Sequence, residues 1–332
     1  MSLRTTALLT TLIAAPAAAD VNVYTTRQPS LVEPVVEAFT DATGIAVNLA
    51  YVDKGLVERL KAEGRRSPAD LIMTVDIANL QKIVDADVIQ PVESEVLENA
   101  VPAALRSPDN LWFGLTTRAR IVYASRDRVA EGEVTTYEDL ADEKWRGRIC
   151  TRSGLHNYNL ALVSGMIAHL GEDGARAWAE GVKANLARKP EGNDRAQVKA
   201  IWAGQCDISL GNTYYMGKML ADPEQVPWAE AVQIVFPEFE NGGTHVNVSG
   251  VAMTKAAPNR DEALQLMEFL VSPQAQGIYA ELNNEYPVLD GAELSDLVKS
   301  WGTFTADETA LDELAGNRAA ALRLMEEVDF DG

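Results

Sequence analysis

Between residues 21 and 86 the sequence alternates between short apolar strands and amphipathic helices, and this alternation limits the chain to very few folds. Three strands are predicted over residues 21–25, 45–52 and 69–75, and three helices over residues 31–43, 55–63 and 77–86. Gly44 and Gly64 end the first two helices, and Asp76 can cap the third. Strands and helices in this order, with short connections, predict a doubly wound α/β lobe.

After Trp112 the pattern changes. Residues 115–125 form a long β-rich stretch with no helix attached, as a strand crossing between two lobes would, and residues 244–254 are a candidate return crossing. Further strands are predicted at 147–150, 206–210 and 232–237, and further helices at 157–170, 172–187, 196–203, 259–271, 273–282 and 307–327. Two crossings between two α/β lobes predict a hinged binding protein with its ligand in the cleft.

The expected division follows these crossings. Residues 20–117 and 247–290 are assigned to the first α/β lobe, and residues 118–246 and 291–332 to the second. About 310 residues remain after the N-terminal segment, more than one ordinary hydrophobic core accommodates.

Residues 1–19 are typical of a cleaved signal peptide. Arg4 supplies a positive charge, an apolar stretch over 7–15 follows, and Ala17-Ala18-Ala19 offers the small residues that signal peptidase needs, so cleavage after Ala19 and a periplasmic location are expected. A buried N-terminal helix is the alternative. No later apolar run approaches the ~20 residues of a membrane span, so no membrane insertion is expected.

The charge balance excludes several partners. Lys and Arg number 29 and Asp and Glu 49, a net charge of −20; loss of Arg4 makes the balance 28 − 49 = −21. Nucleic acid and anionic membranes both require positive charge, so neither is an expected partner.

Cys150 and Cys206 are the two cysteines of the chain. An even pair in an oxidising compartment predicts one disulfide, with two free buried thiols as the alternative. Sequence spacing alone does not show that the two residues meet.

Enzyme signatures are scarce. The sequence lacks the phosphate-binding, dinucleotide-binding, zinc-protease and serine-hydrolase motifs, and its three histidines, His156, His169 and His245, show no spacing typical of a catalytic or zinc site. A non-enzymatic protein is therefore expected. A secreted enzyme or a sensory ligand-binding module is the rival from another class.

The tyrosines carry more information. Tyr214 and Tyr215 are adjacent, and in the first turn of a helix their side chains would diverge by only ~100°, which lets both hydroxyls reach one point. Tyr158 lies in the same predicted lobe, at the start of another helix. A trivalent cation displaces the phenol proton, and three phenolates would neutralise Fe³⁺ with hard oxygen ligands. From the spacing alone, partly buried aromatic packing is the simpler explanation.

Six segments of the chain fit a known pattern: VNVYTTRQPSLVEPVVEAFTDATGI (21–45), SPADLIMTVDIANL (67–80), GLTTRARIVYA (114–124), ICTRSGLHNYN (149–159), CDISLGNTYYMGKM (206–219) and GGTHVNVSG (242–250). With these segments the chain resembles the ferric-iron-binding proteins of bacterial ABC importers. The first two segments are general to the fold, whereas the YN and NTYY elements are specific to the iron group. The resemblance implies a two-lobed class II periplasmic binding fold with two hinge crossings.

The resemblance also implies a metal site. The family's ligands correspond to Tyr158, Tyr214 and Tyr215, all in the second lobe. Members often place a His or Tyr after the arginine of the first strand, but here Gln28-Pro29 follow Arg27, so those first-lobe ligands are missing. The site is then expected to use a synergistic anion such as carbonate or bicarbonate.

Further residues are expected around that anion. Arg27 and Arg118 would hold it, because a guanidinium matches a planar oxyanion, and Arg120 is a weaker candidate. Surface pairing with carboxylates is the alternative for the latter two. Tyr24, Gln28 and Asp76 could line the cleft, although Asp76 could equally be only a helix cap.

The resemblance supports a Cys150–Cys206 disulfide, which would fix Tyr158 relative to the tyrosine pair. It implies delivery of Fe³⁺ to an inner-membrane ABC permease whose ATPase is a separate chain, with the binding protein a monomer. A carrier of another solute, such as a polyamine, thiamine or an oxyanion, is the alternative in the same class.

Overall fold

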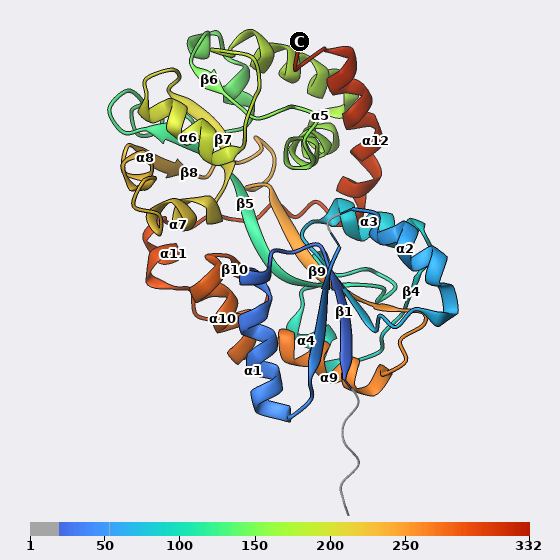
Figure 1. The fold of residues 1–332 in the computed structure, drawn as a ribbon. Coiled ribbons are helices and arrows are strands. Elements are labelled where there is room, and N and C mark those ends of the chain that lie inside the picture. Colours follow the sequence, from blue (N-terminus) through green and yellow to red (C-terminus); the bar gives the residue numbers. More distant parts are fainter. Residues whose placement is uncertain (1–19, 53) are drawn as a thin grey trace, which may run out of the picture.

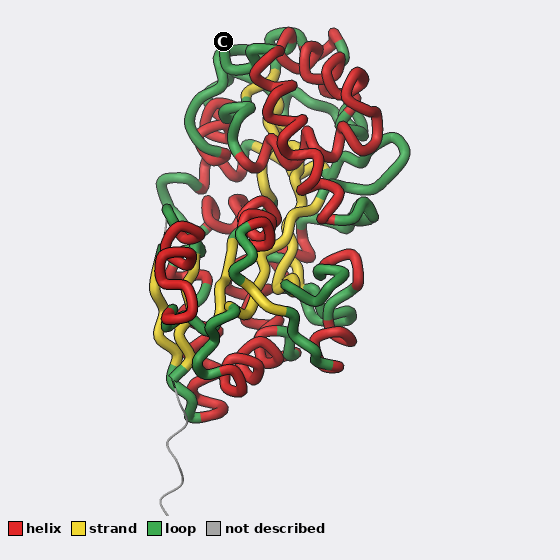
Figure 2. Tube along the Cα trace, turned by 90° about the vertical axis from the view of Figure 1, so that its right-hand side faces the viewer, coloured by secondary structure: helices red, strands yellow, loops and turns green. Residues whose placement is uncertain are grey.

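The computed structural model describes residues 20–52 and 54–332 (Figure 1). The predicted signal peptide, residues 1–19, lies outside the described residues, so its cleavage stays a prediction. In the described ranges, no helix combines the length and the apolar character that crossing a membrane requires. The chain forms two α/β lobes, the lower and the upper part of Figure 1, which are joined by long strands (Figure 2).

The first lobe has the predicted alternation of strands and helices. Its parallel strands are β2 (Val47–Tyr51), β1 (Val21–Thr25) and β3 (Leu71–Thr74), and its first helices are α1 (Glu33–Thr43), α2 (Leu56–Glu63) and α3 (Ile77–Asp85). Gly44 ends α1 in the left-handed conformation with φ 77°, and the Asp76 carboxylate caps α3 by accepting the Asn79 N–H at 2.8 Å. Both predicted helix boundaries are confirmed.

Two long antiparallel strands join the lobes. β5 (Phe113–Ser125) pairs with β9 (Val246–Thr254) through residues 113–119 and then with the second lobe through residues 120–125. On its other edge β9 pairs antiparallel with β3, which places it in the first lobe. The path of the sheet is therefore β2-β1-β3-β9-β5-β7-β6, with both predicted crossings at its centre.

The second lobe is built on the far half of β5. Its strands are β6 (Ile149–Cys150), β7 (Ile208–Asn212) and β8 (Val232–Val235), and its helices are α5 (Asn157–Ala184), α6 (Asp194–Trp202), α7 (Tyr214–Leu220) and α8 (Val226–Glu230). Gly171 breaks α5 with φ 71° and ψ 172°, which separates the two helices predicted there.

The remaining elements complete both lobes. They are α4 (Glu95–Ala100), α9 (Arg260–Leu270), α10 (Pro273–Asn283), α11 (Asp296–Ser300), α12 (Leu311–Glu327), β4 (Ile89–Gln90), β10 (Tyr286–Pro287), and the 3-10 turns η1 (Pro29–Leu31), η2 (Gly64–Arg66), η3 (Ala103–Leu105), η4 (Glu138–Ala141) and η5 (Glu143–Trp145). The short helices α4, α8 and α11 were not expected from the sequence.

The last predicted helix begins later than expected. It was placed at 307–327, but α12 starts at Leu311. Before it, Thr244 N–H donates to the Thr305 carbonyl at 2.8 Å and Asp307 N–H to the Thr244 carbonyl at 2.9 Å. These bonds hold the segment extended beside the start of β9, so it cannot join the helix.

Each lobe has a core on both faces of its sheet. Val23 and Tyr24 are neighbours on β1 and enter different clusters, as do Ile121 and Val122 on β5, because side chains alternate along a strand. Leu314 of α12 packs with the first lobe, whereas Leu324 of the same helix packs with the second. Helix α12 therefore contacts both lobes.

Candidate metal site

The three predicted tyrosines stand at the first turns of two helices. Tyr158 is the second residue of α5, whose N-cap His156 accepts the Tyr158 N–H through Nδ1 at 3.2 Å. Tyr214 and Tyr215 begin α7 directly after strand β7, as the sequence predicted. Gly211 of β7 lies against the ring of Tyr123. A Cβ at position 211 would collide with that ring, so the close packing requires glycine there.

The structure brings these tyrosines together. The Tyr214 hydroxyl donates to the Tyr158 hydroxyl at 3.2 Å. The rings of Tyr214 and Tyr215 lie with centroids 4.4 Å apart at an interplanar angle of 41°. Tyr214 is only 8% exposed, so a group bound at its hydroxyl would be largely removed from water. Phenol oxygens from two helices thus meet in one small region.

The phenols of Tyr214 and Tyr215 resist ionisation. Burial raises the pKa of Tyr214 well above its usual value, and the neighbouring Tyr158 and Tyr215 raise it further, against the opposing charge of Arg118. Burial also raises the pKa of Tyr215 to about 12, with Tyr158 and Asp194 adding to the shift. A phenolate at neutral pH therefore requires a strong cation beside it.

Cationic side chains surround the cluster. The guanidinium carbons of Arg152 and Arg120 lie 5.3 and 6.0 Å from the centre of the Tyr158 ring, and Lys218 Nζ lies 5.6 Å from that of Tyr214. Burial lowers the pKa of Lys218. Lys218 Nζ also donates to Gln28 Oε1 at 3.4 Å, so the predicted cleft residue Gln28 does face the second lobe.

Arg120 belongs to a buried hydrogen-bond network. It is 2% exposed and donates to Asp194 at 2.8 Å, Asn212 at 3.0 Å and Asn159 at 2.5 Å. Asp194 also accepts from Arg152 at 2.9 Å. The alternative of surface pairing for Arg120 is wrong, because its carboxylate partner is fully buried. The network connects the start of α6 to α5, which carries Tyr158, and to the end of β7, which precedes Tyr214.

Arg118 has more unpaired donors than Arg120, whose Nε alone is buried without a partner in the described structure. It is 1% exposed, which also excludes the surface-pairing alternative, and its Nη2 donates to the Val75 carbonyl. Among the residues described, no partner accepts from its buried Nε and Nη1. A buried guanidinium with two unpaired nitrogens is suited to a planar oxyanion.

Arg27 has a partner that the sequence did not reveal. Its Nη2 donates to Glu285 Oε2 at 2.6 Å, and the two side chains are 0% and 5% exposed. Glu285 lies between α10 and β10, 258 residues from Arg27. Nothing in the local sequence marks Glu285 as a site residue, because its role depends on a contact across the fold.

Two candidate cleft residues have structural roles instead. Tyr24 packs into the first-lobe core, and its hydroxyl contacts Glu63 at 2.9 Å and Arg59 at 2.7 Å. Its expected place in the cleft is therefore corrected: alternation along β1 turns the side chain towards α2. Asp76 is 2% exposed and serves as the cap of α3.

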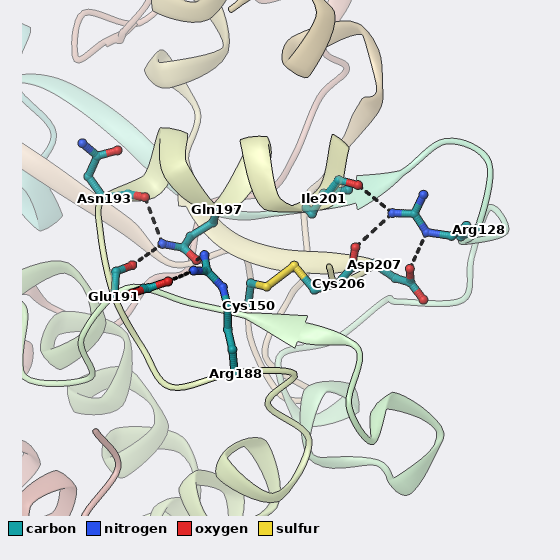
Figure 3. The surroundings of a disulfide bond; sticks show 9 residues. All are labelled: Arg128, Cys150, Arg188, Glu191, Asn193, Gln197, Ile201, Cys206 and Asp207. Carbon is teal, nitrogen blue, oxygen red and sulfur yellow. Dashed lines mark hydrogen bonds and ion pairs between the residues drawn. A yellow bond between two sulfur atoms is a disulfide. The ribbon is translucent and has the colours of Figure 1, made fainter. Parts of the chain in front are cut away.

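The predicted disulfide joins Cys150 and Cys206, whose Cα atoms are 5.8 Å apart (Figure 3). It links the end of β6 to the residue two positions before β7. Beside it, Arg128 donates to the Asp207 carboxylate and to the carbonyls of Ile201 and Cys206. The alternative of two free thiols does not apply to the described chain.

The histidines lie apart from one another. His156 caps α5, His169 contacts Asp307 at 2.9 Å, and His245 is buried at the start of β9. In the described part of the chain, no group of three or more His, Cys, Asp or Glu side chains could hold a metal ion. The tyrosine cluster is therefore the arrangement that offers hard oxygen ligands.

Several known proteins that are similar to this chain are named for iron uptake or ferric iron binding. Residues 66–306 match the model of the bacterial extracellular solute-binding protein family. The iron uptake protein A1 of Synechocystis sp. is 46% identical over 94% of this chain and 87% of its own length.

Two solved structures are also similar. The ferric iron-binding protein A of Mannheimia haemolytica, in an open conformation, has a TM-score of 0.91 and 52% identity over 95% of this chain and 100% of that chain. A Trichodesmium protein in complex with iron and citrate ligands has a TM-score of 0.90 and 42% identity over 94% of this chain and 100% of that chain.

Proposed function

This chain belongs to the family of bacterial extracellular solute-binding proteins, and we propose that it captures ferric iron and delivers it to an ABC permease. The observation that carries the proposal is the meeting of Tyr158, Tyr214 and Tyr215 in the second lobe. The iron-binding relatives at 46% and 52% identity support it.

In this proposal the three tyrosines are the metal ligands. Three phenolates carry three negative charges, which balance Fe³⁺ and satisfy its preference for hard oxygen donors. Binding releases phenol protons, because the raised pKa values of Tyr214 and Tyr215 keep both phenols protonated at neutral pH. Tyrosines do not need a carboxylate or histidine cluster beside them, which agrees with the lack of one in the described residues.

A synergistic anion, carbonate or bicarbonate, completes the proposed site. Arg118 is its main anchor, because Nε and Nη1 are buried without a partner in the described structure. Arg27 lies at the other side and is within electrostatic reach of Tyr214, although Glu285 already holds one of its nitrogens. Citrate is a second candidate, since the Trichodesmium structure contains iron with citrate.

Lobe closure would seal the site. We assign residues 20–117 and 247–290 to the first lobe and residues 118–246 and 291–332 to the second, with bending at β5 and β9. Iron would meet the tyrosines of the second lobe first, and the first lobe would then approach through the contact of Gln28 with Lys218. Because α12 packs against both lobes, it would move with the hinge.

The proposed setting is the periplasm. The protein would act as a monomer and without catalysis, the permease would recognise its closed form, and a separate ATPase would drive import. These expectations rest on the family and on the N-terminal segment, residues 1–19.

A polyamine carrier is less well supported by the site. A polyamine requires carboxylates free to bind ammonium groups. Two buried carboxylates of this region, Asp194 and Glu285, already pair with arginines. The uncommitted charges at the cleft, on Arg118 and Lys218, are positive.

The decisive experiment is an absorption spectrum of the metal-free protein titrated with Fe³⁺, with and without bicarbonate. A phenolate-to-iron charge-transfer band that strengthens with bicarbonate is expected. A protein that stays colourless under both conditions would overturn the iron proposal, and a thermal-shift panel of other solutes would then identify the ligand class.

A further inference from the structure

The ion pair of Arg27 and Glu285 lies in a small buried polar cluster. Glu285 Oε2 accepts from Arg27 Nη2 at 2.6 Å and from the Thr116 hydroxyl at 2.9 Å. The Thr116 hydroxyl is 2.5 Å from that of Ser249. Thr116 belongs to β5 and Ser249 to β9, so the carboxylate is anchored to both crossing strands.

The turn that carries Glu285 also touches the second lobe. Asn284 ends α10 in the left-handed conformation, with φ 54°. Its side chain fills the space that a Cβ on Gly217 would occupy. Gly217 lies in α7, two residues after Tyr215. The turn at Asn284 and Glu285 therefore links the carboxylate partner of Arg27 to α7, the helix that carries Tyr214 and Tyr215.

Arg27 and Arg118 differ in whether a carboxylate neutralises their charge. Arg27 has a carboxylate partner, whereas Arg118 forms no ion pair in the described structure and keeps two free donors. Burial opposes the charge on Glu285, but Arg27 and Arg118 together hold the pKa of Glu285 below its usual value. The carboxylate is thus ionised and occupies the place on Arg27 that an external oxyanion would take.

We propose that Glu285 is a specificity-determining residue. It is the internal counter-ion of Arg27, so it leaves Arg118 as the anion subsite and keeps a second small oxyanion from binding beside Arg27. The inference rests on the proposed anion-assisted function for its biological meaning. Its chemistry, one carboxylate excluding another from a buried guanidinium, is testable on the iron-free protein.

The test replaces the internal carboxylate with an external one. In Glu285→Ala the buried Arg27 loses its partner, which is strongly unfavourable for a desolvated charge. Formate is small enough to take the vacated place. We expect a lowered thermal midpoint that added formate restores, and an affinity for formate at least about tenfold above that of the wild type. If Glu285→Ala folds only when formate is present, that result also supports the inference.

Two controls make the outcome specific. Glu63→Ala removes the carboxylate from another arginine, Arg59 of α2, and should show no formate rescue because that pair is partly exposed. Arg27→Gln in the Glu285→Ala background should abolish the rescue. Glu285→Gln, which keeps the side-chain volume, should show a weaker response to formate in the same direction.

The result that overturns the inference is a Glu285→Ala or Glu285→Gln protein whose thermal midpoint responds to formate no more than that of the wild type. A rescue that persists without Arg27 would also overturn it. In iron-loaded protein, formate should shift the phenolate band of Glu285→Ala but not that of the wild type. If no variant shows an iron band but formate rescue occurs, the iron function fails while the counter-ion role stands.

Discussion

Tyr158 and Tyr214 form a hydroxyl-to-hydroxyl contact of 3.2 Å across a sequence separation of 56 residues. The disulfide Cys150–Cys206 spans the same separation of 56 residues. Each tyrosine therefore lies eight residues after a cysteine (158 − 150 and 214 − 206). Strands β6 and β7 run parallel with Cys150 opposite Ser209, so the disulfide joins the end of β6 to the segment before β7, and both strands lead towards the helices that carry the tyrosines.

Removal of the disulfide should weaken both the fold and the tyrosine cluster. The closed loop of about 56 residues predicts a loss of up to about 4 kcal/mol in the free energy of unfolding for Cys150→Ala/Cys206→Ala. Denaturant unfolding under oxidising conditions measures this loss, and iron titration measures the accompanying drop in affinity. Unchanged iron affinity in a clearly destabilised variant would show that the bridge does not position the tyrosines.

Loss of a hydroxyl from the cluster should reduce iron binding severely. Tyr158→Phe, Tyr214→Phe and Tyr215→Phe each remove one proposed oxygen ligand, and we expect at least about a hundredfold loss of affinity, the equivalent of about 3 kcal/mol. The matched control is Tyr51→Phe, whose hydroxyl contacts Glu33 at the surface. Competition with a coloured chelator measures the affinities, and equal effects at all four positions would contradict the proposed ligand set.

Iron affinity should rise with pH. Tyr214 and Tyr215 are neutral below about pH 10, since their pKa values are raised, to about 12 for Tyr215. Each phenol that binds iron must release its proton, so the affinity should fall as the pH drops from about 7.5 to about 5.5. A chelator competition series at fixed bicarbonate measures this slope. A flat profile would exclude phenolate ligands.

Acid should destabilise the protein through His245. Burial lowers the pKa of this residue to about 3, with Arg120 and Arg118 adding to the shift against the opposing Asp307. The unfolded chain binds the proton near pH 6.5, so the stabilisation is fully present above that pH and is lost as the pH falls towards 3.

At pH 5 the expected loss is about 2 kcal/mol in the free energy of unfolding. Urea unfolding at about pH 7 and about pH 5 measures it. His245→Gln should unfold with a smaller difference between the two conditions. A variant that keeps the full difference would place the acid sensitivity elsewhere.

Arg118 should control the anion dependence of iron binding. Arg118→Gln removes the two free donors, so bicarbonate should no longer strengthen the charge-transfer band, although some iron should still bind the tyrosines. Arg126→Gln is the control, because Arg126 contacts the Glu230 carbonyl at the surface. A variant of Arg118 that responds to bicarbonate like the wild type would assign the anion to another residue.

Much of the architecture could be predicted because local patterns encode it. The alternation over residues 21–86 produced the parallel strands of the first lobe, and the two long strands were recognised because no helix follows them. The position of Tyr214 and Tyr215 in a first helical turn was also local, since the helix starts where β7 ends. The delayed start of α12 was missed because distant backbone, the Thr244 segment, holds residues 305–307 extended.

The sequence by itself determined the order of elements, the two crossings and the residue types that could bind a hard cation. Tertiary structure alone decided how the arginines are used. Arg120 pairs with Asp194, Arg27 pairs with Glu285, and Arg118 is left without a carboxylate. These pairings depend on which side chains, distant in the sequence, folding brings within hydrogen-bonding distance. A buried guanidinium is stabilised by the partner that packing places beside it, and its sequence neighbours do not specify that partner.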